Sequence, residues 1–224
     1  MLTKFSLTIL LLFGSTCYGQ LVKFEPLRNY TKSGRVVFDD VLSHSDTDED
    51  FGRISSTAHE HTHHASNRLY LKEKGYQDYE YLYVLDNYGF KIRWIKSFRL
   101  SDLARKIPAQ YRGGDYKSYL IDAQEWHQKN PITVLDEWNA YTIGTMAAIE
   151  ANEDDFKVND TGSKMLELGI YSFFLAQMAK QNDVNEFCKL EIKRNILITN
   201  KIKMSELTKA NLINFKKVAA ETFK

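Results

Sequence analysis

The sequence has few of the residues that define special classes of protein. Of its 224 residues, only 3 are proline, 11 glycine and 2 cysteine, which excludes collagen-like and Pro-rich linker proteins. Thirty Lys and Arg side chains are balanced by 29 Asp and Glu, so we expect no generic binding to nucleic acid. After the N-terminus no stretch reaches the roughly 18 apolar residues of a membrane span. The remaining composition, 43% hydrophobic and 26% charged, is that of a globular protein.

The N-terminal segment 1–19 is typical of a secretory signal peptide. It combines a short positive start with an apolar run over 5–13 that is too short to cross a bilayer. Cys17 and Gly19 are small residues at the positions required for cleavage before Gln20. A lipoprotein anchored at Cys17 is the weaker alternative, because the preceding lipobox position lacks a large apolar residue. We therefore expect an exported protein, either periplasmic or secreted.

The cysteine content favours a bacterial exported protein. Once the signal peptide is removed, Cys188 is the only cysteine, so the mature chain forms no internal disulfide. Its stability must come from a hydrophobic core, which a chain of about 200 residues can provide. Small secreted domains of animals usually carry a disulfide framework instead.

The hydrophobic pattern predicts an α+β fold that is mainly α-helical, with a small β-sheet in the first half. Residues 20–43 are expected to be an irregular lead-in with a short strand at 35–38, and 43–50 an acidic loop. A hairpin is predicted around residues 86–89. The predicted strands of the hairpin cover 79–85 and 90–95. The first predicted helix begins near residue 51 or 54 and ends at about 73, and later helices cover 101–107, 116–128, 130–151, 163–180, 184–203 and 205–223. Residues 196–198 also allow a strand. Gly75 is predicted to end the first helix, and Ser101, Thr161 and Ser205 to cap later ones.

Residues 59–63 form an HExxH motif that is typical of zinc hydrolases. His59 and His63 lie at positions i and i+4 of a predicted helix, so both imidazoles share one face and can hold the same ion. Glu60 lies beside that line and is expected to accept a proton from a metal-bound water. The sequence therefore predicts a catalytic zinc site on this helix.

The same segment allows two other interpretations. His61 and His64 lie off the line of the motif and are expected to be surface or supporting residues. A solvated, His-rich helix without a defined metal site is the plainest alternative. The series His59-x-His61-x-x-His64 also resembles the HxHxDH pattern of metallo-β-lactamase-like hydrolases, but residue 63 is His where that pattern has Asp.

A catalytic zinc site needs a third protein ligand, and Glu137 is the best candidate. Its neighbours at helical spacing are apolar or small, and a carboxylate on such a face is costly unless a cation compensates it. Gly144, in the middle of the same predicted helix, is expected to let the zinc helix approach closely. Glu125 and Asp136 are the competing ligands. A third His at the metzincin spacing is absent, because position 69 is Leu.

With these residues the chain resembles a zincin metallopeptidase of the gluzincin type. The resemblance implies one Zn²⁺ bound by His59, His63 and Glu137, with Glu60 as general base. It also implies a zincin-like catalytic domain over 20–160, with the helical part 161–224 packed on it. The chain departs from the family in that the clearer hairpin follows the active helix, where an edge strand usually precedes it.

The sequence thus predicts an exported zinc-dependent peptidase acting on a peptide or protein substrate, and it indicates no oligomeric state. The alternative is a non-enzymatic periplasmic metal-binding protein that uses the cluster at 59–64. A third hypothesis is a helical interaction module that binds no metal. The stoichiometry of bound metal discriminates among them, because an enzyme holds one tight ion and a buffer several weak ones.

Overall fold

The computed structural model describes residues 20–28, 33–72, 78–123 and 130–224. The predicted signal peptide, Gly75 and Glu125 lie outside the described residues. The predictions about them are therefore not addressed by the structure.

The fold is an α+β fold dominated by helices, which confirms the predicted fold class. A three-stranded antiparallel sheet has the order β1-β3-β2. The elements are β1 (Gln20–Lys23), α2 (Val36–His44), α3 (Ile54–Lys72), β2 (Tyr79–Leu85), β3 (Tyr88–Arg93), α4 (Leu100–Lys106), the 3₁₀ turn η1 (Ala109–Tyr111), the π-helical turn η2 (Lys117–Asp122), α6 (Thr133–Glu150), α7 (Asp155–Ala179), α8 (Asn182–Thr199) and α9 (Glu206–Thr222). No helix among these combines the length and apolarity that a membrane crossing requires.

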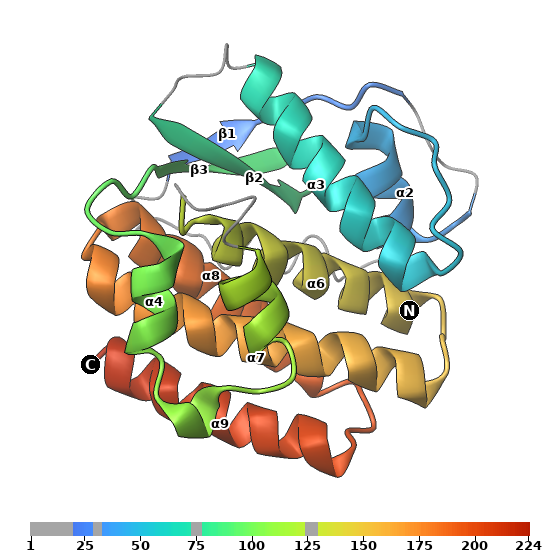
Figure 1. Cartoon of the computed structure of the whole chain (residues 1–224). Coiled ribbons are helices and arrows are strands. Elements are labelled where there is room, and N and C mark those ends of the chain that lie inside the picture. Colours follow the sequence, from blue (N-terminus) through green and yellow to red (C-terminus); the bar gives the residue numbers. More distant parts are fainter. Residues whose placement is uncertain (1–19, 29–32, 73–77, 124–129) are drawn as a thin grey trace.

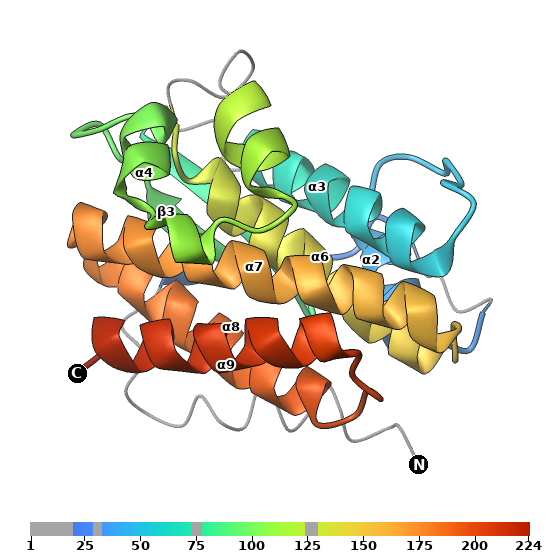
Figure 2. The same ribbon diagram turned by 60° about the horizontal axis from the view of Figure 1, so that its bottom comes forward.

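Helix α6 lies in the middle of the molecule. In Figure 1 the sheet, α2 and α3 lie above it, whereas α7 and then α9 lie below it. Figure 2 shows α7 between α6 and α9, with α4 on the side away from α2. Trp138 of α6 is fully buried, and its ring packs edge-on against Phe173, Phe187 and Phe215 of the three C-terminal helices. These aromatic contacts join the C-terminal helices to the rest of the core.

The predicted hairpin is confirmed as β2 and β3. Leu85, Asp86 and Asn87 at its turn all have positive φ angles, a conformation that Asp and Asn tolerate better than most residues. Gly89, in β3, lies where α3 packs on the sheet. A Cβ at this position would lie 1.9 Å from Cδ2 of Leu69, so only glycine lets α3 pack this closely.

The outer edge of β2 is occupied by polar side chains of two helices. Ser66 Oγ of α3 accepts a hydrogen bond from the Tyr83 backbone N–H at 2.9 Å. Asn139 Nδ2 of α6 donates to the Tyr83 carbonyl oxygen at 2.7 Å. The buried backbone groups of Tyr83 are thereby satisfied, and the sheet is fixed to the two helices that carry the candidate site.

The strand predicted at 35–38 is wrong, because helix α2 begins at Val36. The two β-branched valines suggested a strand, but two backbone N–H groups at the start of the helix find a distant acceptor. The carboxylate of Glu150, at the end of α6, accepts from the N–H of Val36 at 2.6 Å and of Val37 at 2.8 Å. Glu150 thus satisfies N–H groups that the first turn of a helix leaves without a partner. Because it is distant in the chain, the residues around 36 give no sign of the helix start.

Two predicted helix caps are also wrong, and one is confirmed. Helix α4 begins at Leu100, so Ser101 lies inside it. Helix α7 begins at Asp155 with Asp154 as its cap, so Thr161 also lies inside the helix, where its hydroxyl bonds to the carbonyl of Lys157. The boundary expected at 160/161 therefore falls within a continuous helix. Ser205 does cap α9 by accepting from the Thr208 N–H.

Candidate metal centre

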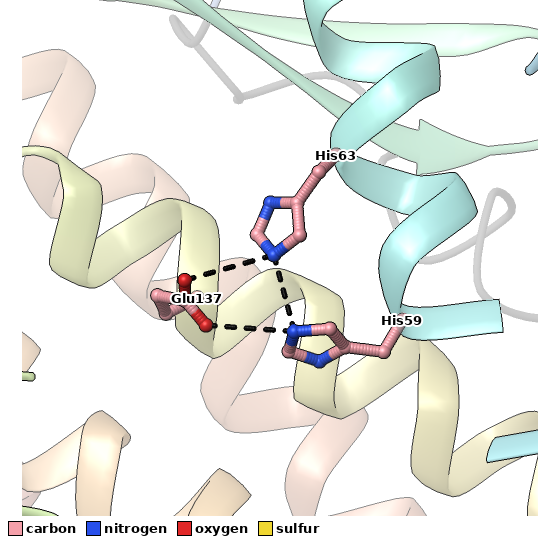
Figure 3. Close-up of side chains that lie close together, drawn as sticks. All are labelled: His59, His63 and Glu137. Atoms are coloured by element: carbon pink, nitrogen blue, oxygen red, sulfur yellow. Dashed lines mark hydrogen bonds and ion pairs between the residues drawn. The ribbon is translucent and has the colours of Figure 1, made fainter. Parts of the chain in front are cut away.

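The structure brings His59, His63 and Glu137 together at the crossing of α3 and α6. Their side chains converge in Figure 3, where both histidines come from α3 and the glutamate from α6. The two imidazole Nε2 atoms are 3.1 Å apart. Glu137 Oε2 lies 3.5 Å from His59 Nε2, and Oε1 lies 3.7 Å from His63 Nε2. One atom from each residue lies within 4.8 Å of the others, so the group can hold a metal ion.

Asp136 fixes the orientation of His63. Its Oδ2 accepts a hydrogen bond from Nδ1 of His63 at 2.7 Å. With the proton held on Nδ1, the other ring nitrogen, Nε2, faces His59 and Glu137. A carboxylate behind a ligating histidine sets its tautomer and increases its basicity. We call His59, His63 and Glu137 the ligand group. Asp136, which the sequence offered as a competing ligand, therefore lies behind this group rather than in it.

The two histidines carry opposite pKa shifts. Burial lowers the pKa of His59 well below its usual value, and the positive charge of His63 lowers it further. Burial also opposes the charge on His63, but the charge and hydrogen bond of Asp136, together with Glu137 and Glu60, raise the pKa of His63 to about 9. With a pKa of about 9, His63 carries a proton at neutral pH, and its Nε2 lies 3.1 Å from Nε2 of His59. That proton must leave before both nitrogens can bind one cation.

Glu137 is a carboxylate in costly surroundings. Burial, together with the charges of Asp136 and Glu60, raises the pKa of Glu137 to about 7 against the opposing effect of His63. Within the described residues, its buried Oε2 has no hydrogen-bond partner. A buried oxygen of this kind is destabilising unless a proton or a cation compensates it.

Gly144 lets the two helices approach closely enough to form the group. A Cβ at this position would lie 2.7 Å from the carbonyl oxygen of Ser55 and 3.4 Å from Cβ of His59. Any larger residue would push α3 away from α6. The close approach expected at Gly144 from the sequence is thus present, and it occurs beside His59 itself.

A cavity of about 270 Å³ opens beside the ligand group. Glu60 lines it, and its side chain is 45% exposed, with Oε1 lying 4.0 Å from His59 Nε2. Tyr119 and Tyr141 also line it, and their hydroxyls share a hydrogen bond of 2.6 Å. Burial raises the pKa of both tyrosines, to about 12 for Tyr141. Both therefore stay protonated at neutral pH and can donate hydrogen bonds.

The other two histidines of the motif region point elsewhere. His61 is fully buried, and its Nε2 contacts the carbonyl oxygen of Glu49 at 2.9 Å. The ring of Phe51 packs edge-on against it. His64 lies near the surface, with Nδ1 3.0 Å from Asp46 Oδ1. Both side chains hold the loop between α2 and α3, and neither joins the ligand group.

Sequence reasoning did not predict two contacts of the site. The role of Asp136 follows from the angle at which α6 crosses α3, and the adjacent acidic residues at 136–137 were its only signal. The hydrogen bond between Tyr119 and Tyr141 depends on how η2 lies against α6, which no local pattern of the sequence shows.

Comparisons of the chain with protein-family models, curated proteins and solved structures find no match. The site must therefore be interpreted from its own chemistry.

Proposed function

We propose that this protein is an exported zinc-dependent peptidase, with His59, His63 and Glu137 as the zinc ligands and Glu60 as the general base. The observation that supports this best is the convergence of three ligand atoms from two helices within 4.8 Å. A diffuse His-rich surface would not bring in a half-buried glutamate from a helix distant in the chain.

The chemistry of the donors fits zinc. Two imidazole nitrogens and one carboxylate are a common ligand set of catalytic zinc, which leaves a further position open. The unpaired Oε2 of Glu137 is the kind of buried atom that a cation would satisfy, and Asp136 behind His63 is the kind of support that such ligands usually have. Bound zinc would supply a Lewis acid that polarises a carbonyl group and makes water more acidic.

The protein's own residues account for the remaining steps. Glu60, at the exposed side of His59, would take a proton from water in the cavity and pass it to the departing amine. Tyr119 and Tyr141 would keep a protonated hydroxyl on the wall of the same cavity. Glu137 and Asp136 are partly buried, which would shield the ligand group from bulk solvent and strengthen its electrostatic effects.

Glu60→Gln tests the catalytic role. Glutamine keeps the size of the side chain but cannot accept the proton, so we expect hydrolysis of an unfolded protein substrate such as casein to fall by about 100- to 10,000-fold. The variant should bind one zinc ion per chain with unchanged affinity, as elemental analysis and chelator competition would measure.

Two outcomes would contradict the proposal. Equal cleavage by wild type and Glu60→Gln would exclude Glu60 as the base. Stoichiometric zinc binding without cleavage across a broad peptide library would favour the metal-binding protein instead.

A further inference from the structure

A second cavity lies next to the one beside the ligand group. Its volume is about 670 Å³, against about 270 Å³ for the first. Asp160 and Lys164 of α7 line both cavities. The second cavity extends from them to the start of α9 and to the loop at 113–115. The two cavities therefore lie next to each other along α7.

The walls of this second cavity are chemically distinctive. Phe156 and Leu207, two large apolar side chains on its rim, are 79% and 65% exposed. Asp155 and Asp160 each lie within 4 Å of a lysine ammonium group. Asp115 and Glu167 also line the cavity, and burial raises the pKa of both carboxyls. Four carboxylates thus line the cavity against one lysine, Lys164, so a further negative charge would be unfavourable here.

We propose that this second cavity is a substrate groove that binds a polypeptide segment with a large apolar side chain and rejects acidic side chains. The proposal rests on the peptidase function proposed above. Phe156 and Leu207 supply apolar surface for the bound side chain, and the carboxylates of Asp115 and Glu167 repel an acidic one. We name it the α7–α9 groove.

Binding to an inactive protein tests the groove separately from catalysis. We would measure the fluorescence anisotropy of labelled Gly-Ser peptides with a central Leu-Leu or Glu-Glu pair, using zinc-loaded Glu60→Gln. The Leu-Leu peptide should bind about 10-fold more tightly or better. The added double substitution Phe156→Ser and Leu207→Ser should weaken its binding by about 5- to 20-fold.

The chain offers a matched control and an independent second variant. Ile213 lies on the same helix as Leu207 and is similarly exposed, at 68%, but it does not line the groove. Ile213→Ser should therefore leave binding unchanged. Gly114 lines the groove, and a Cβ there would meet no atom within 4 Å. Gly114→Trp should fill the groove and block the Leu-Leu peptide, and thermal unfolding would check that each variant folds.

The outcomes test the groove independently of the proposed peptidase function. Equal affinity for the two peptides would overturn the groove, as would losses no larger than that of Ile213→Ser. Whether wild type cleaves peptides is scored independently. A groove-dependent preference without any cleavage would support the groove and contradict the peptidase function.

Discussion

Helix α3 carries four histidines in six residues, and they divide into two pairs with different surroundings. His59 and His63 face α6, a half-buried glutamate and a cavity. His61 and His64 face the loop before the helix, where they contact the Glu49 carbonyl and the Asp46 carboxylate. The first pair can share a cation because Glu137 lies beside it, whereas no third ligand joins the second pair within the part of the chain that the structure describes.

The two pairs also differ in the charged groups around them; we call their surroundings the α6 face and the loop face. On the α6 face, Glu60, Asp136 and Glu137 act on the pKa of His63, and the charge of Asp136 also acts on Glu137 and Glu80. On the loop face, within the described residues, each histidine has one hydrogen-bonding contact. The α6 face therefore brings several partly buried carboxylates against one histidine pair, which suits a bound cation, whereas the loop face has the single pairings of a structural contact. Four predictions test this difference.

The largest difference should appear in metal affinity. Alanine at His59, His63 or Glu137 removes one of three ligands, and we expect the affinity for zinc to fall by on the order of 1,000-fold. Alanine at His64 should leave it unchanged. Elemental analysis and competition with a chromophoric chelator would measure both. Equal losses at all four histidines would instead indicate a diffuse metal buffer.

Asp136 should have the next largest effect. Asp136→Asn can still accept a hydrogen bond from His63 but no longer carries the charge, so zinc affinity should decrease by about 10- to 100-fold. Asp46→Asn is the matched control, because Asp46 has the same kind of contact with His64 on the loop face. Calorimetric titration with zinc would compare them, and equal effects would remove the distinction between the two faces.

On the loop face, substitution should affect folding rather than metal binding. His61→Ala removes a fully buried ring and its contact with Glu49, and should lower the free energy of unfolding by about 2–3 kcal/mol. His64→Ala, at the surface, should change it by less than about 0.5 kcal/mol. Urea denaturation would measure both. A loss of zinc from folded His61→Ala would show that the two faces are not independent.

The smallest effect concerns Glu80, next to the α6 face. Burial raises the pKa of Glu80 to about 7, and the charge of Asp136 contributes. Since the folded pKa lies above the unfolded one, ionisation of Glu80 lowers stability as the pH rises from about 4.5 to 7. Glu80→Gln should stabilise the metal-free protein at pH 8 by about 1 kcal/mol and give no gain at pH 4. Exposed Glu221→Gln serves as control, and a gain independent of pH would refute the assignment.

Patterns in the sequence predicted those features that are determined by residues close together in the chain. The helix at 54–73, the hairpin and the Ser205 cap were found because their signals lie within a few residues. Glu137 was found because a carboxylate on an apolar helix face needs compensation. The start of α2 was not predicted, because the carboxylate that accepts its first N–H groups belongs to the distant Glu150. The position of Asp136 behind His63 likewise depends on the packing of two helices, which the sequence does not encode locally.

The occupied edge of β2 has a consequence for self-association. A free strand edge offers unpaired N–H and C=O groups to the strand of another molecule and is a common starting point for aggregation. At Tyr83 both groups are bonded to Ser66 and Asn139. Since these partners belong to the helices that bear the histidines and the glutamate, any loosening of α3 from α6 would also uncover this edge. We therefore expect a variant that separates α3 from α6 to expose the Tyr83 backbone groups to other molecules.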